Sequence, residues 1–447
     1  MNRRDFSRRL AGAVGALSLG GISAAAFSAR DRSGIPLGAD PSLRVDGDRI
    51  NRHLTELAEF GKNPYGGVSR TAYTEFDKQG REYVMRLMRE AQLEVSIDLA
   101  GNILGRRAGS DPTAKILLFG SHIDSVPDGG NYDGDVGVLS SIEVARLLAA
   151  RGITTRHPIE VVVFQNEEGG TVGSRGMVGD LGEADLARVA VSGKTWRDGI
   201  AFLGGDPTKL TAPLKKQGDV AAYVELHIEQ GGTLEANKVD IGVVEGIVGI
   251  GWWDVTIEGF GNHAGTTPMN NRRDALLAAA KYVQMVNRVV TSEPGRQVGT
   301  VGRIQAFPGA PNVIPGQVRT TLEIRDLERA KILRLAEKVM AEAKKIGDEN
   351  GTTFTFKDTY LSTPAMMESG VQKTIEAAAK GLGLTTQYQP SGAGHDAQYM
   401  AHIAPSGMIF CPSVGGISHS PKEYTKPQDV VNGANVLLQT LLRLDAM

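Results

Sequence analysis

The length, composition and charge of the 447-residue chain exclude several classes of protein. One hydrophobic core rarely serves a chain of this length, so two domains are expected. Hydrophobic residues make up 41% and charged residues 22%, as in ordinary soluble globular proteins. A net charge of −2 gives no reason to expect nucleic acid as a partner. The single cysteine, Cys411, excludes an internal disulfide.

The first 29 residues predict an export signal rather than part of a folded domain. Asn2-Arg-Arg-Asp-Phe-Ser-Arg8 is typical of a twin-arginine signal, and a Gly/Ala-rich run follows at 10–26. We expect cleavage by residue 29, a linker at 30–45, a periplasmic protein and no membrane attachment after cleavage. An uncleaved membrane anchor is the alternative.

Helices and strands alternate from residue 47 onwards. Apolar residues at helical spacing predict helices at 47–61, 74–90 and 137–152, and later at 369–381 and 429–444. Apolar runs predict strands at 93–97, 102–105, 115–119, 159–164 and 223–230, and later at 386–389 and 407–411. This order predicts an α/β domain with a mostly parallel sheet, in which ligands lie at the carboxyl ends of strands.

The segment 242–358 has a different order of elements. Its strands are expected at 250–259, 298–306, 317–325 and 352–357, and its helices at 272–290 and 326–350. The order βαββαβ is that of the ferredoxin-like plait. We therefore expect an inserted domain that divides the first domain into 40–241 and 359–447.

Polar residues gather where three predicted strands end. The stretch 119–135, F-G-S-H-I-D-S-V-P-D-G-G-N-Y-D-G-D, follows the first and contains His122. Carboxylates this crowded repel one another unless a cation lies among them, although a solvated loop is the alternative. Glu167 and Glu168 follow the next strand, where one could bind a metal while the other faces substrate; a solvated turn is again the alternative. His227 lies in the strand after that.

Five of the eight histidines lie in glycine-rich or strand-end motifs with carboxylates nearby. These are His122, His227, His263, His395 and His419. Glycine lets the backbone approach a ligand closely in such loops. The other three, His53, His157 and His402, have no such surroundings, and we interpret them as structural or exposed.

Taken together, these motifs resemble the dinuclear zinc hydrolases of the aminoacylase and carboxypeptidase superfamily. The motifs that carry the resemblance, in chain order, are G-S-H-I-D, N-Y-D-G-D, E-E-G, E-L-H-I-E-Q-G, G-N-H-A-G-T-T-P-M, P-N-V-I-P-G, S-G-A-G-H-D-A and G-I-S-H-S-P. The resemblance covers essentially the whole mature chain. The hydantoinase/carbamoylase branch fits best, which contains N-carbamoyl-L-amino acid hydrolases, β-ureidopropionases and allantoate amidohydrolases.

The resemblance implies two divalent metal ions per subunit, zinc or possibly manganese, cobalt or nickel. Asp133 would bridge the two ions, and the remaining ligands would be His122, Glu168, His227 and His419. Asp124 would accept the other N–H of His122 and fix its tautomer. Glu167 would act as the general base that takes a proton from the metal-bridging water.

The resemblance also assigns the inserted domain to homodimerisation and to closure over the substrate. His263 would lie far from the metals of its own subunit and stabilise the oxyanion in the neighbouring subunit's site. Asn312 and Arg325 would bind the substrate carboxylate. Gln230 and His395 would hold the ureido end.

One loop departs from the family's usual pattern. The residues after E-E-G, at 170–177, form a shorter loop without the Arg-Phe that usually follows, which leaves the shape of the pocket open. We expect a metal-dependent amidohydrolase that cleaves the C–N bond of a small N-carbamoyl-L-amino acid or a close N-acyl or ureido analogue. The alternatives are an allantoate amidohydrolase, a dipeptidase or aminoacylase of the same superfamily, and a periplasmic metal- or solute-binding protein.

Overall fold

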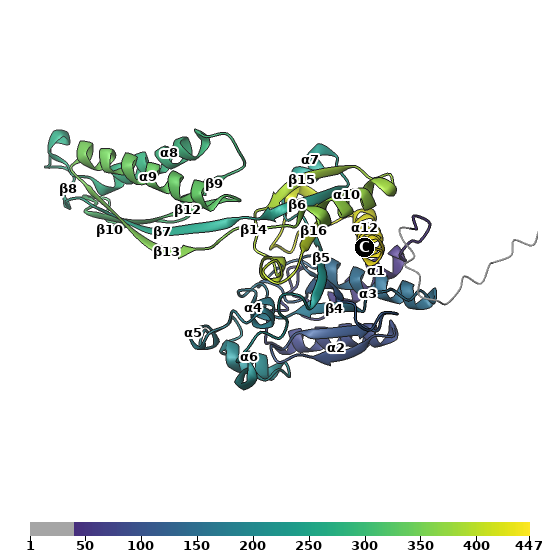
Figure 1. The fold of residues 1–447 in the computed structure, drawn as a ribbon. Coiled ribbons are helices and arrows are strands. Elements are labelled where there is room, and N and C mark those ends of the chain that lie inside the picture. The colour runs from purple at the N-terminus through teal and green to yellow at the C-terminus, as the bar shows by residue number, and fades with distance from the viewer. Residues whose placement is uncertain (1–39) are drawn as a thin grey trace, which may run out of the picture. The chain divides into compact units, whose positions relative to one another are not determined.

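The computed structural model describes residues 40–447 (Figure 1). The predicted signal at 1–29 and most of the predicted linker therefore lie outside the described residues. Two sheets dominate the described part of the chain, one of nine strands and one of five. Within residues 40–447, no helix is long and apolar enough to cross a membrane.

The nine-stranded sheet has the order β1-β2-β4-β3-β5-β16-β6-β14, and β15 also pairs with β6. Its strands are β1 (Glu94–Ile97), β2 (Ile103–Arg107), β3 (Ile116–His122), β4 (Ile159–Phe164), β5 (Val220–Ile228), β6 (Ile241–Ile247), β14 (Ala365–Met366), β15 (Thr386–Ser391) and β16 (Ser406–Cys411). The central pairs β4–β3, β3–β5 and β5–β16 are parallel, as is β15–β6, and the outer pairs are antiparallel. The predicted α/β class with a mostly parallel, mixed sheet is confirmed.

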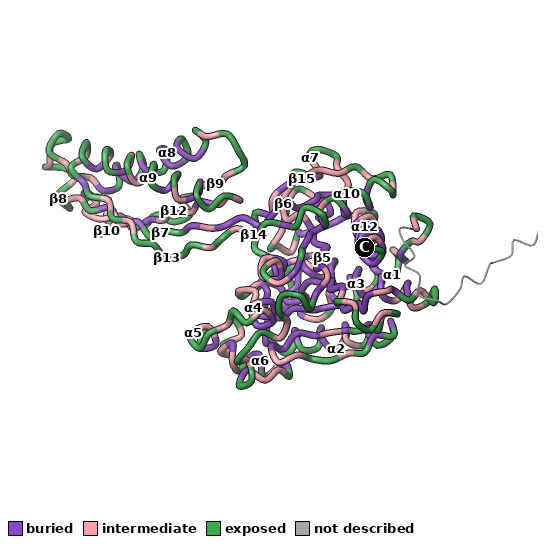
Figure 2. Tube along the Cα trace, in the orientation of Figure 1, coloured by how far each residue is buried: buried purple, intermediate pink, exposed green. Residues whose placement is uncertain are grey.

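The sheet is covered on both faces, so its central strands are buried along nearly their whole length (Figure 2). All six residues of β4 are buried. Val161 and Val163 belong to one hydrophobic core, whereas Val162 and Phe164 belong to another. Successive side chains of a strand point to opposite faces, so a continuous apolar run suits a strand with two covered faces.

All five helices that the sequence predicts for this part of the chain are present. Those that pack around the large sheet are α1 (Gly47–Leu57), α2 (Glu75–Glu90), α3 (Asp135–Ala150), α10 (Ser369–Gly381) and α12 (Pro427–Asp445). Shorter helices are α4 (Val172–Val178), α5 (Glu183–Leu186), α6 (Trp196–Phe202), η1 (Pro207–Lys209), α7 (Thr233–Asn237), α11 (Ala397–Met400) and η3 (Val414–Gly416). Thr74 caps α2 by accepting the backbone N–H of Asp77.

The five-stranded sheet is antiparallel and has the order β10-β12-β7-β13, with β9 also paired to β12. Its elements are β7 (Gly249–Glu258), α8 (Ala275–Thr291), β9 (Val298–Thr300), β10 (Ile304–Phe307), β12 (Gln317–Asp326), α9 (Arg329–Asn350) and β13 (Thr353–Leu361). Both helices contribute to a core on one face of this sheet, together with Trp253, Val255 and Ile257. Three short elements lie between these in the chain: β8 (Asn262–His263) and η2 (Met269–Asn271) come between β7 and α8, and β11 (Val313–Ile314) comes between β10 and β12. β8 and β11 pair with each other. The βαββαβ order of the plait is confirmed, and its predicted second strand is divided into β9 and β10.

The large sheet extends further along the chain than the sequence predicts. Residues 242–247, expected in the inserted domain, belong to β6 of the large sheet. Val243 and Val244 are fully buried there, one in each of its two cores. The second sheet begins at Gly249 and its last strand continues to Leu361, beyond the expected end at residue 358. Only one residue separates β6 from β7, so no turn motif marks the change of sheet.

Candidate metal centre

The candidate site lies at the carboxyl ends of three neighbouring strands of the large sheet. His122 is the last residue of β3, His227 is the last but one of β5, and Glu167 follows the end of β4. Parallel strands bring these ends to one edge, as expected. Asp133 precedes α3, and His419 lies in the loop between β16 and α12.

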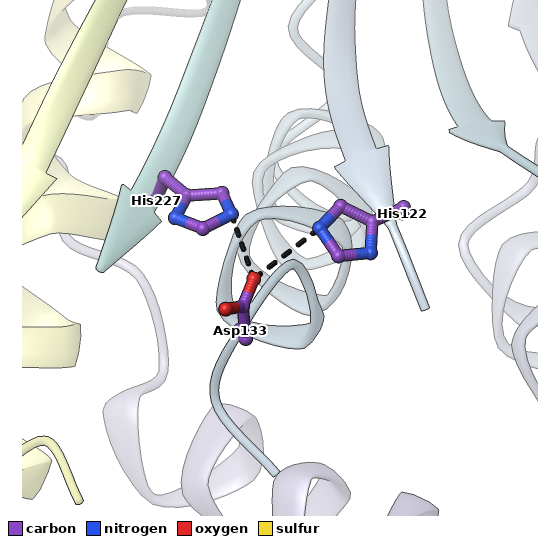
Figure 3. Close-up of side chains that lie close together, drawn as sticks. All are labelled: His122, Asp133 and His227. Carbon is purple, nitrogen blue, oxygen red and sulfur yellow. Dashed lines mark ion pairs between the residues drawn. The ribbon is translucent and has the colours of Figure 1, made fainter. Parts of the chain in front are cut away.

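Asp133 lies at the centre of the predicted ligands. Its Oδ1 lies 3.4 Å from Nε2 of His122 and 3.1 Å from Nε2 of His227 (Figure 3). Its Oδ2 lies 3.5 Å from Nε2 of His419, which in turn lies 3.4 Å from Oε2 of Glu168. Within each of these two groups, the potential ligand atoms lie within 4.8 Å of one another. Asp133 belongs to both groups, as a bridging ligand must.

The D-G-D sequence explains how His122 and Asp133 come so close. Gly134 has φ of 68°, a conformation that glycine adopts without strain. A Cβ at this position would lie only 2.6 Å from the imidazole ring of His122. Glycine is therefore required between Asp133 and the first residue of α3.

The buried histidines fit a cation. Nε2 of His122 and of His227 is buried and has no hydrogen-bond partner among residues 40–447, which is unusual for buried polar atoms. Nδ1 of His122 lies 3.0 Å from the carbonyl oxygen of Asp124, and Nδ1 of His227 lies 2.9 Å from that of Ile228. A carbonyl only accepts, so each Nδ1 carries a proton, and in the neutral ring each Nε2 would present the lone pair that a metal needs. Imidazole with carboxylate suits zinc, manganese, cobalt or nickel.

Asp124 differs from its predicted role in detail. The sequence assigns its carboxylate to His122, but the carbonyl oxygen takes that position and the carboxylate lies 3.9 Å from Nδ1. The strand ends at His122, so the alternation of side chains does not extend to Asp124. Its carboxylate instead accepts the backbone N–H of Glu167 at 3.1 Å and of Glu168 at 3.2 Å. Asp124 therefore orients the loop that carries both glutamates.

Glu167 lies beside the ligand group of His122. Its Oε2 is 3.9 Å from Nε2 of His122, and the residue is 9% exposed. Burial raises the pKa of Glu167 well above its usual range, against the opposing charge of His122. A carboxylate that is costly to keep ionised accepts a proton readily, which a general base must do.

The charges of the ligands are balanced among themselves. Burial alone would raise the pKa of Asp133, but His227, His122 and His419 hold that pKa well below its usual range. Burial, and then the charge of Asp133, raise the pKa of Glu168 to about 8. The hydrogen bond to Asp133 raises the pKa of His419 to about 9. Protons thus occupy the positions that a cation would take.

Gln230 and His395 also lie at the centre. Gln230 donates from Nε2 to Oδ2 of Asp133 at 2.7 Å, and its buried Oε1 has no partner in the described chain. The ring of His395 packs edge-on against that of His227, with centroids 4.5 Å apart, and its Nε2 lies 2.9 Å from Ser391 Oγ. Burial lowers the pKa of His395 well below its usual range, so this ring is neutral.

The other predicted residues lie on the second sheet or beside it. Arg325, in β12, donates to Glu323 at 2.8 Å and to the carbonyl oxygen of Gly392 at 2.7 Å. Gly392 belongs to the S-G-A-G-H-D-A loop that also carries His395. Asn312 is exposed, and its carbonyl oxygen accepts the N–H of Ala264 at 3.0 Å. Arg325 thus contacts the loop that carries His395, whereas the backbone of Asn312 contacts the loop of β8.

His263 lies in β8, beyond the end of β7 that is remote from β6 (Figure 1). The ten residues of β7 span about 33 Å, so His263 is far from the point where the chain leaves the large sheet. Its exposed ring accepts the backbone N–H of Gly265 and Thr266 at Nδ1, at 3.0 and 3.2 Å. The proton of the neutral ring therefore lies on Nε2, which is a donor.

Sequence reasoning missed two contributors to the centre, Ser418 and Glu423. The Ser418 hydroxyl lies 3.1 Å from Oδ2 of Asp133 and 2.9 Å from Oε2 of Glu423. Both residues occur in the motif around His419, but no spacing rule connects them with a segment almost 300 residues earlier. Only the folded chain shows the contact.

The fold and the two groups of potential ligands together define a class of protein, an α/β hydrolase with a candidate metal centre. A family model, Peptidase family M20/M25/M40, matches residues 118–443, and the chain belongs to that family. It is 40% identical over 405 residues to an N-carbamoyl-L-amino acid amidohydrolase of Geobacillus stearothermophilus, covering 90% of this chain and 99% of the relative. It is 33% identical over 401 residues to an allantoate amidohydrolase of Escherichia coli (strain K12), covering 88% and 97%.

A solved structure agrees with these relatives. An amidase of the hydantoinase/carbamoylase family from Burkholderia multivorans is 39% identical, with a TM-score of 0.86 over 91% of this chain and 100% of that chain. The resemblance to the hydantoinase/carbamoylase branch is confirmed, and the protein is a hydrolase that acts on C–N bonds.

Proposed function

We propose that this hydrolase is a metal-dependent amidohydrolase that cleaves the C–N bond of N-carbamoyl-L-amino acids or close N-acyl or ureido analogues. The observation that carries the proposal is the pair of ligand groups that share Asp133, with Glu167 beside them. The names of the relatives support the substrate class, since several are N-carbamoyl-L-amino acid amidohydrolases.

Two divalent ions per subunit would complete the site. His122, Asp133 and His227 would hold one, and Asp133, Glu168 and His419 the other. Bound ions of this kind polarise a substrate carbonyl and lower the pKa of water. Zinc suits the donor set, as do manganese, cobalt and nickel.

Glu167 performs the proton transfers in this proposal. It takes a proton from the water that attacks the carbamoyl carbon and delivers that proton to the departing nitrogen. The C–N bond then breaks, leaving the free amino acid and carbamic acid, which decomposes to ammonia and carbon dioxide.

Residues of the second sheet would bind and orient the substrate. Arg325 would exchange its present acceptors, Glu323 and Gly392, for the substrate carboxylate, with Asn312 as a further donor. Gln230 and His395 would contact the ureido end. His263 would donate from Nε2 to the oxyanion in the site of a second subunit, so the proposed active form is a homodimer through the inserted domain.

A substrate panel tests the proposal. Metal-loaded protein is incubated with N-carbamoyl-L-amino acids, N-acyl-L-amino acids, dipeptides and allantoate, and the release of ammonia and free amino acid is measured. We expect the fastest turnover with an N-carbamoyl-L-amino acid. Faster turnover of allantoate would favour the second candidate, which the 33% identical relative supports. Tight binding without hydrolysis of any compound would instead indicate a solute-binding protein.

We also propose export to the periplasm by the twin-arginine route. The proposal rests on the sequence of residues 2–8. Replacing both Arg3 and Arg4 by lysine should retain the protein in the cytoplasm; an unchanged periplasmic fraction would contradict the proposal.

A further inference from the structure

A buried carboxylate connects the two loops that carry Asp133 and His419. Glu423 is 6% exposed. Its Oε1 accepts the backbone N–H of Tyr132 at 3.0 Å and of Asp133 at 3.1 Å. Its Oε2 accepts the hydroxyl of Ser418 at 2.9 Å and the backbone N–H of His419 at 3.3 Å. One carboxylate therefore holds four donors from segments about 290 residues apart.

The chain leaves room for this carboxylate at Gly130. A Cβ at Gly130 would lie 2.2 Å from Oε1 of Glu423. Any larger residue there would displace the carboxylate from the amides of Tyr132 and Asp133. The loop before α3 is thus shaped around the side chain of Glu423.

His419 depends on such support more than the other histidine ligands do. His122 and His227 belong to β3 and β5, where pairing with neighbouring strands fixes the backbone. His419 lies in a loop, and its side chain is 49% exposed. Its φ of 53° lies in the left-handed region, which is unfavourable for a residue with a Cβ and persists only where surrounding contacts impose it.

We propose that Glu423 is a positioning residue that holds His419 in the conformation in which it binds the second cation. It acts through the backbone N–H of His419 and through Ser418, whose hydroxyl lies between Glu423 and Oδ2 of Asp133. The inference rests on the proposed two-metal site, and it requires nothing about the substrate.

Glu423→Gln disrupts the contact of Oε2 with the N–H of His419 and retains the contacts of Oε1. The amide oxygen can still accept the N–H groups of Tyr132 and Asp133, but the amide nitrogen then faces the N–H of His419, donor against donor. Loss of a partner that orients a metal ligand typically costs about 10- to 100-fold in metal affinity. We expect a loss of this size for the cation held by Glu168 and His419, and little change for the cation held by His122 and His227.

Asp445→Asn is a matched control. Asp445 is also buried, at 2% exposed, and its carboxylate accepts two backbone N–H groups, those of Arg156 at 3.0 Å and His157 at 2.8 Å. Within residues 40–447, no hydrogen bond or ion pair joins it to any of the proposed metal ligands. This variant makes the same chemical change away from the centre and should leave both metal affinities unchanged.

The test is a titration of metal-stripped protein with Co²⁺, followed by its absorption spectrum and by metal analysis, with thermal unfolding measured in parallel. We expect two binding steps in the unmodified protein and in Asp445→Asn, and a selective loss of one of the two steps in Glu423→Gln. Two unaltered steps in Glu423→Gln would overturn the inference, as would an equal loss of both steps together with a lower unfolding temperature.

Ser418→Ala keeps the test decisive if Glu423→Gln does not fold. It retains the carboxylate and removes only the hydroxyl that joins Glu423 to Asp133. A selective weakening of one of the two binding steps supports the inference, and no weakening or an equal loss of both steps overturns it.

Failure of the unmodified protein to bind two ions would refute the two-metal proposal itself. Absence of hydrolysis with two ions bound would refute only the substrate assignment.

Discussion

The predicted site residues of the two sheets differ in how far they are buried and in how close they lie to one another. On the large sheet, His122, Asp133 and His227 are buried, and their ligand atoms lie within 4.8 Å of one another. Beside the second sheet, His263 and Asn312 are exposed, and no hydrogen bond or ion pair of the described chain joins them to those ligands. The difference fits the proposed function, in which one chain assembles its metal ligands by folding, whereas substrate contacts would require closure or a second subunit. Variants in the two regions should therefore change different quantities.

Glu167→Gln should have the largest effect. It removes the proposed base and retains the shape of the side chain, so we expect kcat to fall by about 10²- to 10⁴-fold or more while two metal ions remain bound. Steady-state kinetics with metal analysis checks this. Glu168→Gln is the matched control and should lose metal as well as turnover. Near-normal activity of Glu167→Gln would refute the mechanism.

His263→Ala should reduce kcat by about 10²- to 10³-fold, the usual cost of losing an oxyanion donor, and leave metal content unchanged. Mixing it with Glu167→Gln tests the shared site. A mixed dimer contains one site with both groups intact, so random exchange should restore roughly a quarter of the unmodified activity. No recovery in dimers shown to have exchanged would mean that His263 does not serve the partner's site.

Arg325→Ala should reduce kcat/KM by about 10- to 100-fold, mainly through KM, because hydrogen bonds to charged groups contribute about 1.5–3 kcal/mol. Metal affinity should not change. Arg319→Ala, in the same strand and exposed, is the control and should have kinetics close to those of the unmodified protein. Equal effects of the two variants would show that Arg325 does not bind the carboxylate.

The smallest expected effect is the pH dependence of metal binding. In the metal-free protein, the raised pKa values of Glu168, about 8, and His419, about 9, mean that both hold protons at pH 7. A cation must displace these protons, so affinity should rise with pH until about 9, by at most about tenfold per pH unit for each proton released. Calorimetry in buffers of different ionisation enthalpy measures the protons. A pH-independent affinity would contradict these protonation states.

The sequence predicts most of the fold, because local patterns carry it. β4 begins and ends where the apolar run 159–164 does, and α10 has its predicted bounds. The extension of the large sheet to residue 247 was not predictable, because β6 and β7 form a nearly continuous run and only tertiary pairing separates them.

Part of the candidate site could likewise be predicted from the sequence, and part could not. The resemblance of the motifs to a known family implies the ligand groups around Asp133. The carboxylate contacts of Asp124, the Gln230 hydrogen bond to Asp133 and the position of Glu423 depend on how loops pack after the strands end. No spacing rule describes those contacts, so they became visible only in the structure.

The most direct test of the central claim is the release of ammonia from an N-carbamoyl-L-amino acid as metal is returned to stripped protein. The account predicts no release without metal, a rise that ends at two equivalents of metal per subunit, and equal amounts of ammonia and free amino acid. Full activity in the stripped protein, or substrate binding without release at any metal content, would contradict it.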